Sequence, residues 1–428
     1  MKVYFHTLGC KVNQYETQAM ESLLRERGFE IVTDSGGCDM VIVNTCAVTA
    51  ESGRKSRQAI RRLKTENPDA VIGVCGCFAQ IEPDSIAGLA DVLGGSGDRR
   101  GFIENMDRAY RERQLIVDLD KPLKRREFEN LPAGRLEGRT RAMMKIQDGC
   151  SNFCSYCVIP YARGPVRSMC LADCEAEAKR LSDSGVNEIM ITGIEIASYG
   201  RDFRDGTNLI DAILTIAHAA PNTRLRLGSL EPRIITEDFC VRLKNLPNLC
   251  PHFHLSLQSG CDDTLRRMGR KYDTARFYES VTLLNEHFPD CGITTDLIVG
   301  FPGETEEEFA ETLAFIEKCG FSRMHIFPYS VRPGTAAADM PEQVSKEVKH
   351  SRARRAAAVA AELERRFLEG RVGTVQPVLF ETEHSGVFLG HAPNYCEVEV
   401  KGENLRDKVK NVQIISVNGD KLVGNIIL

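Results

Sequence analysis

The chain has 428 residues, of which 42% are hydrophobic and 27% charged, and its formal net charge is −5. This length is enough for two or three domains with separate cores, and the composition is that of a globular protein. The negative net charge excludes a uniformly basic nucleic-acid binder. No stretch approaches the roughly 20 apolar residues that a membrane-spanning helix needs. We therefore expect a cytoplasmic protein with no membrane partner.

The first segment, residues 1–105, alternates short β-branched runs with amphipathic stretches. The expected strands are Lys2–Thr7, Met40–Asn44 and Ala70–Val74. The expected helices are Tyr15–Arg27 and Glu51–Thr65. This alternation is typical of a parallel sheet with crossover helices, so we predict an N-terminal parallel α/β domain.

The second segment, residues 135–369, repeats the strand–helix unit and ends in a long helix. Its expected strands are Ala142–Gln147, Glu188–Thr192, Arg224–Leu227, His252–Leu257, Ile293–Val299 and Arg323–Phe327. Its expected helices are Ala172–Ser184, Leu209–Ala219, Thr236–Leu246, Thr274–His287, Glu306–Lys318 and Lys346–Leu368. The six strands of this α/β segment predict an open, partial (β/α)6 barrel, in which functional residues gather at the carboxyl ends of the strands.

The third segment, residues 370–428, changes to short strands separated by Gly and Asn turns. The expected strands are Val375–Glu381, Val387–Leu389, Cys396–Val400, Asn411–Val417 and Leu422–Leu428. Asn418-Gly419 is a good hairpin turn. The pattern predicts a small β-barrel, a fold that often binds oligonucleotides, although fold alone does not establish function.

The most informative motif spaces Cys150, Cys154 and Cys157 as C-x-x-x-C-x-x-C. Three thiolates can hold three irons of a [4Fe–4S] cluster and leave the fourth iron open, whereas four cysteines make a closed cluster that only carries electrons. A zinc knuckle or unrelated thiols are the alternatives, but zinc sites prefer a second closely spaced pair, and Cys170 and Cys174 form a looser one. The spacing resembles the signature of radical S-adenosylmethionine enzymes.

A second set of cysteines follows the ends of expected strands. Cys10, Cys46 and Cys77 each come just after a strand of the first segment. Because the carboxyl ends of parallel strands meet at one edge of a sheet, we expect these thiols to lie together and hold a second cluster. Coincidental thiols are the alternative. Spacing does not separate Cys75 from Cys77; Cys77 is preferred because it lies in the turn, whereas Cys75 would end the buried strand.

Together these motifs resemble the radical S-adenosylmethionine methylthiotransferase family over nearly the whole chain. The resemblance is carried by Thr7–Asn13, Asn44–Cys46, Gly76–Ala79 and Ile146–Cys150. It implies three domains: residues 1–105 with an auxiliary cluster on Cys10, Cys46 and Cys77, residues 135–369 as the radical core, and residues 370–428 as a TRAM-like RNA-binding barrel.

Three stretches are most similar to the threonylcarbamoyladenosine branch of the family: Thr7–Asn13, Thr192–Gly200 and Leu255–Cys261. The implied reaction converts N6-threonylcarbamoyladenosine, at tRNA position 37 adjacent to the anticodon, to 2-methylthio-N6-threonylcarbamoyladenosine. It proceeds by radical sulfur insertion at C2 and then methylation. The branches that modify isopentenyladenosine in tRNA or an aspartate of a ribosomal protein are the alternatives.

The resemblance also implies two [4Fe–4S] clusters and S-adenosylmethionine, as radical source and methyl donor. The residues expected to contact S-adenosylmethionine are Tyr156, Thr192, Gly193, Glu195, Glu231 and Gln258. Tyr156 is expected near its adenine, and the Thr192–Glu195 turn near its methionine end. Glu231 and Gln258 follow strand ends and are candidates for polar contacts, with ordinary loop residues as the alternative.

The implied partners are the anticodon loop of tRNA, whose unstacked bases can enter a pocket, and a reducing protein such as flavodoxin or ferredoxin. Basic clusters within residues 54–64, 121–126 and 346–366 are candidates for a phosphate-binding surface or, alternatively, solvated helix faces. The histidines of the expected strands are interpreted as structural: His252, His254 and His325.

Two other interpretations compete with this one. A non-catalytic iron–sulfur RNA-binding protein would leave the open-iron spacing and the six strand–helix units without a purpose. A radical enzyme whose second cluster only relays electrons would need a fourth ligand near Cys10.

Overall fold

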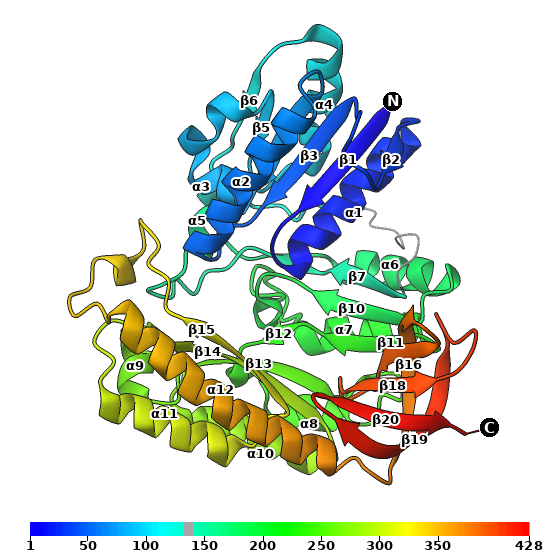
Figure 1. Ribbon diagram of the computed structural model, residues 1–428, viewed down its shortest axis with the longest axis vertical. Coiled ribbons are helices and arrows are strands. Elements are labelled where there is room, and N and C mark those ends of the chain that lie inside the picture. Colours follow the sequence, from blue (N-terminus) through cyan, green and yellow to red (C-terminus); the bar gives the residue numbers. More distant parts are fainter. Residues whose placement is uncertain (132–139, 428) are drawn as a thin grey trace.

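The computed structural model describes residues 1–131 and 140–427. It has three parts: an N-terminal α/β part, a central curved sheet with helices on its outside, and a C-terminal barrel packed beside the central sheet (Figure 1). The expected domain start at residue 135 and the expected strand end at Leu428 lie outside the described residues. Within the described ranges, each helix is too short or too polar to cross a bilayer.

The N-terminal part is a six-stranded parallel sheet in the order β2-β1-β3-β4-β5-β6. Its strands are β1 (Lys2–Thr7), β2 (Glu30–Val32), β3 (Met40–Thr45), β4 (Val71–Gly76), β5 (Val92–Gly94) and β6 (Ile116–Asp118). Its helices are α1 (Lys11–Glu26), α2 (Ala50–Glu66), α3 (Cys77–Ile81) and α4 (Arg99–Glu112).

Helices cover both faces of this sheet, as the continuous apolar runs of β3 and β4 require. On one face, Tyr15 of α1 and Phe102 of α4 belong to one apolar cluster. On the other face, Ile60 of α2 and Phe78 of α3 belong to a second cluster. The strand ends therefore point toward the central part, where a site can form.

The central part is a curved run of parallel strands. One sheet has the order β11-β10-β7 and the next β12-β13-β14-β15, with β12 continuing directly after β11. The strands are β7 (Arg141–Lys145), β10 (Glu188–Thr192), β11 (Arg224–Leu227), β12 (Ser229–Leu230), β13 (His252–Gln258), β14 (Gly292–Val299) and β15 (Arg323–Pro328). A short antiparallel pair, β8 (Gln147–Asp148) and β9 (Arg167–Ser168), lies beside them.

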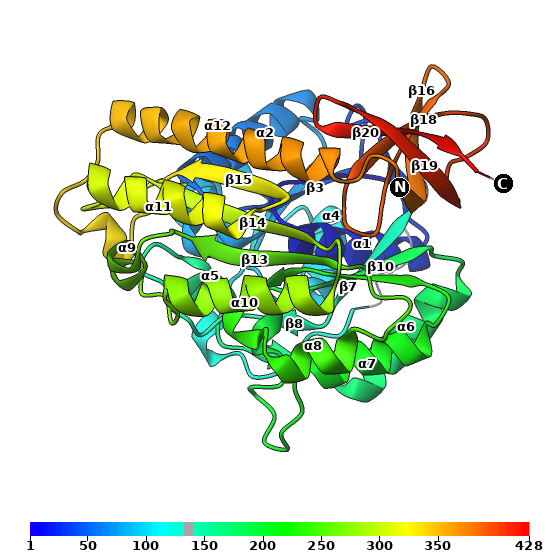
Figure 2. The same ribbon diagram turned by 90° about the horizontal axis from the view of Figure 1, so that it is seen from below.

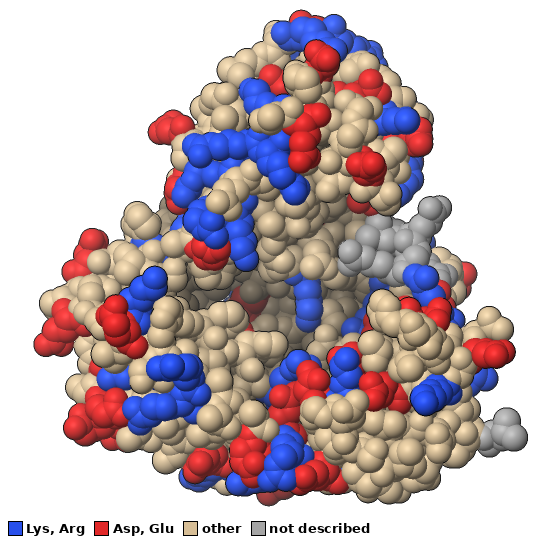
Figure 3. Space-filling model, in the orientation of Figure 1, with Lys and Arg blue, Asp and Glu red and all other residues tan. Residues whose placement is uncertain are grey.

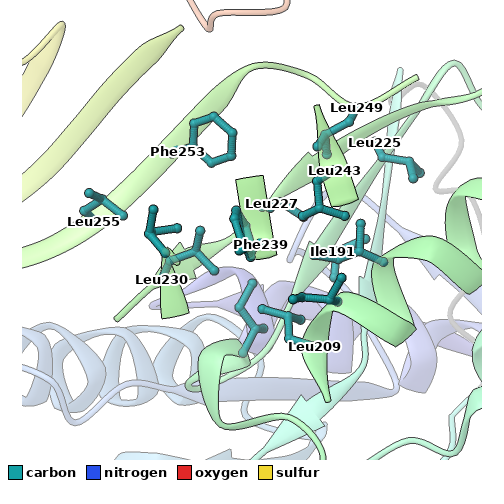
Figure 4. Close-up of a cluster of buried hydrophobic side chains, with 14 of the residues drawn as sticks. Ile191, Leu209, Leu225, Leu227, Leu230, Phe239, Leu243, Leu249, Phe253 and Leu255 are labelled. Atoms are coloured by element: carbon teal, nitrogen blue, oxygen red, sulfur yellow. The ribbon is translucent and has the colours of Figure 1, made fainter. Parts of the chain in front are cut away.

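Helices lie on the outside of the curved sheet (Figure 2). They are α6 (Leu171–Asp183), α7 (Leu209–Ala219), α8 (Glu237–Leu243), α9 (Asp262–Arg267), α10 (Thr274–His287), α11 (Glu306–Cys319) and α12 (Lys346–Glu369). Leu209, Leu227, Phe239 and Phe253 pack between helices and strands in one apolar core (Figure 4). These helices thereby cover the outer surface of the sheet. Its inner surface faces the N-terminal part and the barrel.

The C-terminal part is a closed five-stranded barrel in the order β16-β17-β18-β20-β19. Its strands are β16 (Val375–His384), β17 (Val387–His391), β18 (Glu397–Lys401), β19 (Val409–Asn418) and β20 (Lys421–Ile426). Phe380, Phe388, Val398 and Leu422 are among the residues that fill its interior. The expected fold class, two parallel α/β units followed by a small β-barrel, is confirmed.

Candidate active site

The first cysteine set lies in the loop between β8 and α5 (Ile159–Arg163). The loop turns at Gly149, where φ is +74° and a Cβ would lie 1.9 Å from the Pro165 carbonyl oxygen, so only glycine fits. Cys150, Cys154 and Cys157 all line one cavity. The sequence motif therefore places its three sulfur-bearing side chains around one space.

Nearby donors and charges act on these thiols. Arg270 Nη1 donates to Cys154 Sγ at 3.2 Å, and burial raises the pKa of both Cys150 and Cys157 to about 12. The neighbouring Cys154 raises both further, whereas Arg270 opposes the shift. A bound iron would replace these protons, because coordinating thiols are deprotonated. Three thiols around one cavity beside a guanidinium group fit a cluster with one open iron.

The second set lies at the carboxyl ends of β1, β3 and β4, as expected from the strand positions. Cys10 caps the start of α1, Cys77 begins α3, and a Cβ on Gly9 would lie 2.9 Å from Cys46 Sγ. Burial raises the pKa of Cys77 to about 11, with Cys10 and Cys46 adding to the shift. Cys75 points instead into the apolar core beneath the sheet. The structure thus brings Cys77, and not Cys75, to the other two cysteines.

The cysteine sets are not spaced like ligands of one metal ion. Among residues 1–131 and 140–427, no group of three or more His, Cys, Asp or Glu side chains has an arrangement that could hold a single ion. A tetrahedral zinc site needs such a group. A four-iron cluster does not require such a group, so the cluster interpretation is compatible with this arrangement.

A buried charge network connects the two cysteine sets. Arg163 Nε donates to Cys77 Sγ at 3.1 Å, and its other nitrogens bond Glu16 and Asn13. Lys145 Nζ lies 3.4 Å from Glu16 and 3.3 Å from Asp148, two residues before Cys150. Burial opposes ionisation of Glu16, but Arg163, Arg99 and Lys145 together lower its pKa to about 2. The network therefore stays charged while it holds the two parts together.

A cavity of about 660 Å³ lies where the three parts meet, and its size suits a cofactor together with part of a nucleotide. Figure 3 shows the hollow below the N-terminal part. The lining includes Cys10 and Lys11 from the N-terminal part, the first cysteine set from the central part, and His391 and Tyr395 from the barrel. All three parts therefore contribute to one site.

Four of the residues expected to contact S-adenosylmethionine line this cavity: Tyr156, Thr192, Gly193 and Glu195. Burial raises the pKa of Glu195 to about 7; Arg270 opposes this shift and Glu231 adds to it. Glu195 Oε1 is buried without a hydrogen-bond partner among the described residues. Such an orphaned acceptor suits the ammonium group or a hydroxyl of a bound cofactor.

The other two expected residues do not line the cavity. Glu231 accepts a hydrogen bond from Arg233 Nε at 2.8 Å and acts on Glu195 only through its charge. Gln258 lies at an irregular pairing near the end of β13, with φ at +68°. Their expected contacts with the cofactor stay a prediction.

The cavity also exposes residues to which sequence reasoning assigned no role. His252, His254 and His325, interpreted as structural, line its wall, together with Lys11 and Tyr395. Histidine alternates with apolar residues in β13, and this pattern could have indicated that one face of the strand lies outside the apolar core. The position of Lys11 beside Cys10 could have indicated that it lies near the site. No feature of the sequence indicated Tyr395, because its position depends on how the barrel packs against the central part.

Comparison with known proteins shows the same parts. The model of the Radical SAM superfamily matches residues 144–316, and that of the uncharacterized protein family UPF0004 matches residues 2–94. The threonylcarbamoyladenosine tRNA methylthiotransferase MtaB of Bacillus subtilis is 40% identical to the chain, over 96% of this chain and 93% of that protein. The chain belongs to the radical S-adenosylmethionine methylthiotransferase family. It is an enzyme of that class.

Other relatives are named for more than one substrate. MtaB of Thermotoga maritima is 36% identical over 99% of this chain and 98% of its own. The tRNA-2-methylthio-N(6)-dimethylallyladenosine synthase of Clostridium tetani is 35% identical over 82% and 78%. Among solved structures, the radical S-adenosylmethionine methyltransferase TsrM of Kitasatospora setae has a TM-score of 0.59 at 17% identity, covering 79% of this chain and 77% of that one. That likeness supports the fold alone.

Proposed function

We propose that this enzyme adds a methylthio group to C2 of N6-threonylcarbamoyladenosine at position 37 of tRNA, adjacent to the anticodon. One observation carries the proposal: a single cavity is lined by the first cysteine set and by Cys10 of the second. A target carbon in that cavity is within reach of both a radical source and a sulfur source. The relatives named for this modification support the choice of substrate.

The two cysteine sets hold the two clusters in this proposal. Cys150, Cys154 and Cys157 ligate the cluster that binds S-adenosylmethionine, and Cys10, Cys46 and Cys77 ligate the auxiliary one. When bound, these groups supply the radical, the sulfur and the methyl group, which no side chain can provide. The protein supplies placement: Gly149 turns the first loop into the cavity, and Arg163 fixes the Cys77 side of the second set.

Tyr156, Thr192, Gly193 and Glu195 line the wall that would hold the cofactor. Glu195 Oε1, which has no hydrogen-bond partner among the described residues, could accept a hydrogen bond from the methionine ammonium. Glu231 and Gln258 lie outside the cavity lining, so we assign them an indirect role: Glu231 acts on the cofactor through the charge of Glu195. Arg270 holds a positive charge between Cys154 and the substrate space.

The tRNA approaches the hollow from the side of α2. Basic side chains gather over this helix in Figure 3, and Arg54, Lys55, Arg61 and Arg62 of α2 are exposed. Glutamates pair with Arg54 and Arg62 on this helix, and in α12 Arg352 and Arg355 are likewise paired with glutamates. If tRNA phosphates bind α2 and the RNA also contacts the barrel beside the hollow, the target nucleotide of the anticodon loop could splay into the cavity. A flavodoxin- or ferredoxin-like protein supplies the electrons.

Mass spectrometry of tRNA nucleosides tests the proposal. In cells that lack the gene, 2-methylthio-N6-threonylcarbamoyladenosine should disappear and its unthiolated precursor accumulate. The wild-type gene should restore the product, and Cys150→Ala or Cys77→Ala should not. If the isopentenyl analogue is lost instead, the substrate belongs to the branch represented by the Clostridium tetani relative. If all tRNA nucleosides are unchanged, the proposed substrate is wrong.

A further inference from the structure

The cavity has two chemically different ends. The cysteine loop, Thr192 and Glu195 lie past the carboxyl ends of the strands. The opposite end is lined by His252 and Arg323, which are the first residues of β13 and β15, and by side chains of β14. The barrel packs against this second end: a Cβ on Gly292, the first residue of β14, would lie 2.1 Å from the Asn394 carbonyl oxygen.

The second end presents donors without partners. His254 is bound on both sides, with Nδ1 2.9 Å from Thr294 Oγ1 and Nε2 3.3 Å from Asp296. The side chains of Lys11 and His325 also line the cavity; both are exposed, and neither makes a hydrogen bond or ion pair with a described residue. The Asp296 carboxylate is bonded to His254, and its charge also acts on Lys11 and His325, whose ammonium group and imidazole line the cavity.

A stack of aromatic side chains lies next to these donors. Tyr395 stacks on His252 with ring centres 4.5 Å apart, and on His391 at 4.8 Å. The guanidinium of Arg226 lies 4.8 Å from the Tyr395 ring centre, and Arg226 Nε is bonded to Glu188 at 2.8 Å. Tyr395 has φ at +72°, an uncommon and costly conformation for a bulky residue, which often marks a functional site.

These features match one part of the proposed substrate. The threonylcarbamoyl group carries a planar carbamoyl unit, a hydroxyl and a carboxylate, whereas the isopentenyl group has no polar atom. N6 lies on the same edge of the base as C2, so a base with C2 directed at the cysteines keeps its N6 substituent inside the cavity. An apolar substituent there would remove water from Lys11 and His325 without replacing its hydrogen bonds, which is unfavourable.

We infer that Lys11 and His325 bind the threonine carboxylate of the N6 substituent, and that this contact selects threonylcarbamoyladenosine over isopentenyladenosine. The inference rests on the proposed function and adds the residues that determine specificity. Lys11 and His325 are exposed in the free protein, and a bound base would cover them. Sites that hydrogen-bond a polar group discriminate strongly against analogues that lack it, because donors covered by the analogue are then left unpaired.

Binding of synthetic anticodon stem-loops tests the inference without turnover. The holoenzyme, without reductant, is titrated with stem-loops that carry threonylcarbamoyladenosine, its threonine methyl ester or isopentenyladenosine. The wild type should prefer the acid to the ester by about 10- to 100-fold, as expected for loss of hydrogen bonds to a charged group. In Lys11→Met this preference should nearly vanish, and in His325→Phe it should fall. Lys179→Met, on the exposed side of α6, is the matched control and should keep the full preference.

The iron content of each variant is measured beside the binding, because Lys11 follows Cys10. If Lys11→Met loses iron, His325→Phe decides the test, since its position is far from the cysteines in sequence. If both variants keep the wild-type preference for acid over ester, the inference is overturned, while conversion of the threonylcarbamoyl stem-loop would leave the proposed function standing. If the wild type prefers the isopentenyl stem-loop, the proposed function fails and the inference with it.

Discussion

At the scale of single residues, Cys75 and Cys77 illustrate how one turn separates a core thiol from a candidate ligand. Cys75 is fully buried among apolar side chains, whereas Cys77 begins α3 beside Arg163. We expect Cys77→Ala to reduce the iron content of anaerobically reconstituted protein from about eight to about four atoms per chain. Cys75→Ala removes a thiol of the same strand turn and should keep the full content. Equal iron loss in both variants would contradict the assignment.

Arg163 is the residue whose removal should cost most stability. It is fully buried, donates to Glu16, Asn13 and Cys77, and lies near Asp148. In Arg163→Met the buried carboxylates lose a partner, so we expect the free energy of unfolding to fall by about 3–5 kcal/mol. Denaturant titration of the apoprotein measures this. Arg61→Met, on the exposed face of α2, should change stability by no more than about 0.5 kcal/mol.

At the scale of elements, the turn from β4 to α3 depends on Gly76. Its φ is +102°, and a Cβ there would lie 2.4 Å from the Thr45 carbonyl oxygen. Gly76→Ala must therefore shift the strand end next to Cys77, at an expected cost of about 1–3 kcal/mol. The variant should also lose iron from the second set. Gly88→Ala is the control, because no atom lies within 4 Å of its added Cβ; similar effects at both positions would refute the argument.

Elements with a strong periodic signal could be predicted from sequence, and short ones could not. β3 and β4 are continuous buried runs, and the expected strands of the central part all form. β2, β5 and β6 have three residues each, too few for a period to show. Helix α1 begins at Lys11, four residues before its expected start. Cys10 stands at its N-cap position and its side chain makes no capping hydrogen bond, so no conventional capping residue marks the start in the sequence.

The sequence predicted the cysteines of the candidate site, which form recognisable motifs or follow strand ends. It did not predict the residues whose place depends on how the barrel packs against the central part. The spacing of Cys150, Cys154 and Cys157 predicted the first set, and the parallel topology of the N-terminal strands predicted the position of the second. His254 belongs to an alternating strand, and sequence cannot tell whether the face it shares meets solvent, core or a cavity. Tyr395 reaches the cavity from the barrel, and its ring contacts span more than 140 residues of chain to His252. Such long-range contacts leave no local pattern.

At the scale of the whole molecule, Glu188 holds the barrel against the central sheet through three arginines. Arg226, Arg224 and Arg141 form ion pairs with its carboxylate at 2.8, 2.9 and 3.1 Å. Each also reaches the barrel: Arg226 donates to the Pro393 carbonyl oxygen at 2.8 Å, Arg224 to that of Pro377 at 3.3 Å, and Arg141 to the Glu381 carboxylate at 2.9 Å. One buried carboxylate thus organises the surface on which the Tyr395 loop sits.

This arrangement predicts a pH-dependent attachment of the barrel. Burial opposes ionisation of Glu188, but Arg226 and Arg141 lower its pKa well below the ordinary 4.5. A carboxyl whose folded pKa is depressed stabilises the fold above its unfolded pKa, and this stabilisation is lost as pH falls toward the folded value. Glu188→Gln should therefore lower hydrogen-exchange protection in β16 and β18 at pH 7, and its difference from wild type should shrink below about pH 4.5. Glu175→Gln, exposed on α6, should match wild type throughout. A difference that stays constant between pH 7 and pH 3 would show that the Glu188 charge does not hold the barrel.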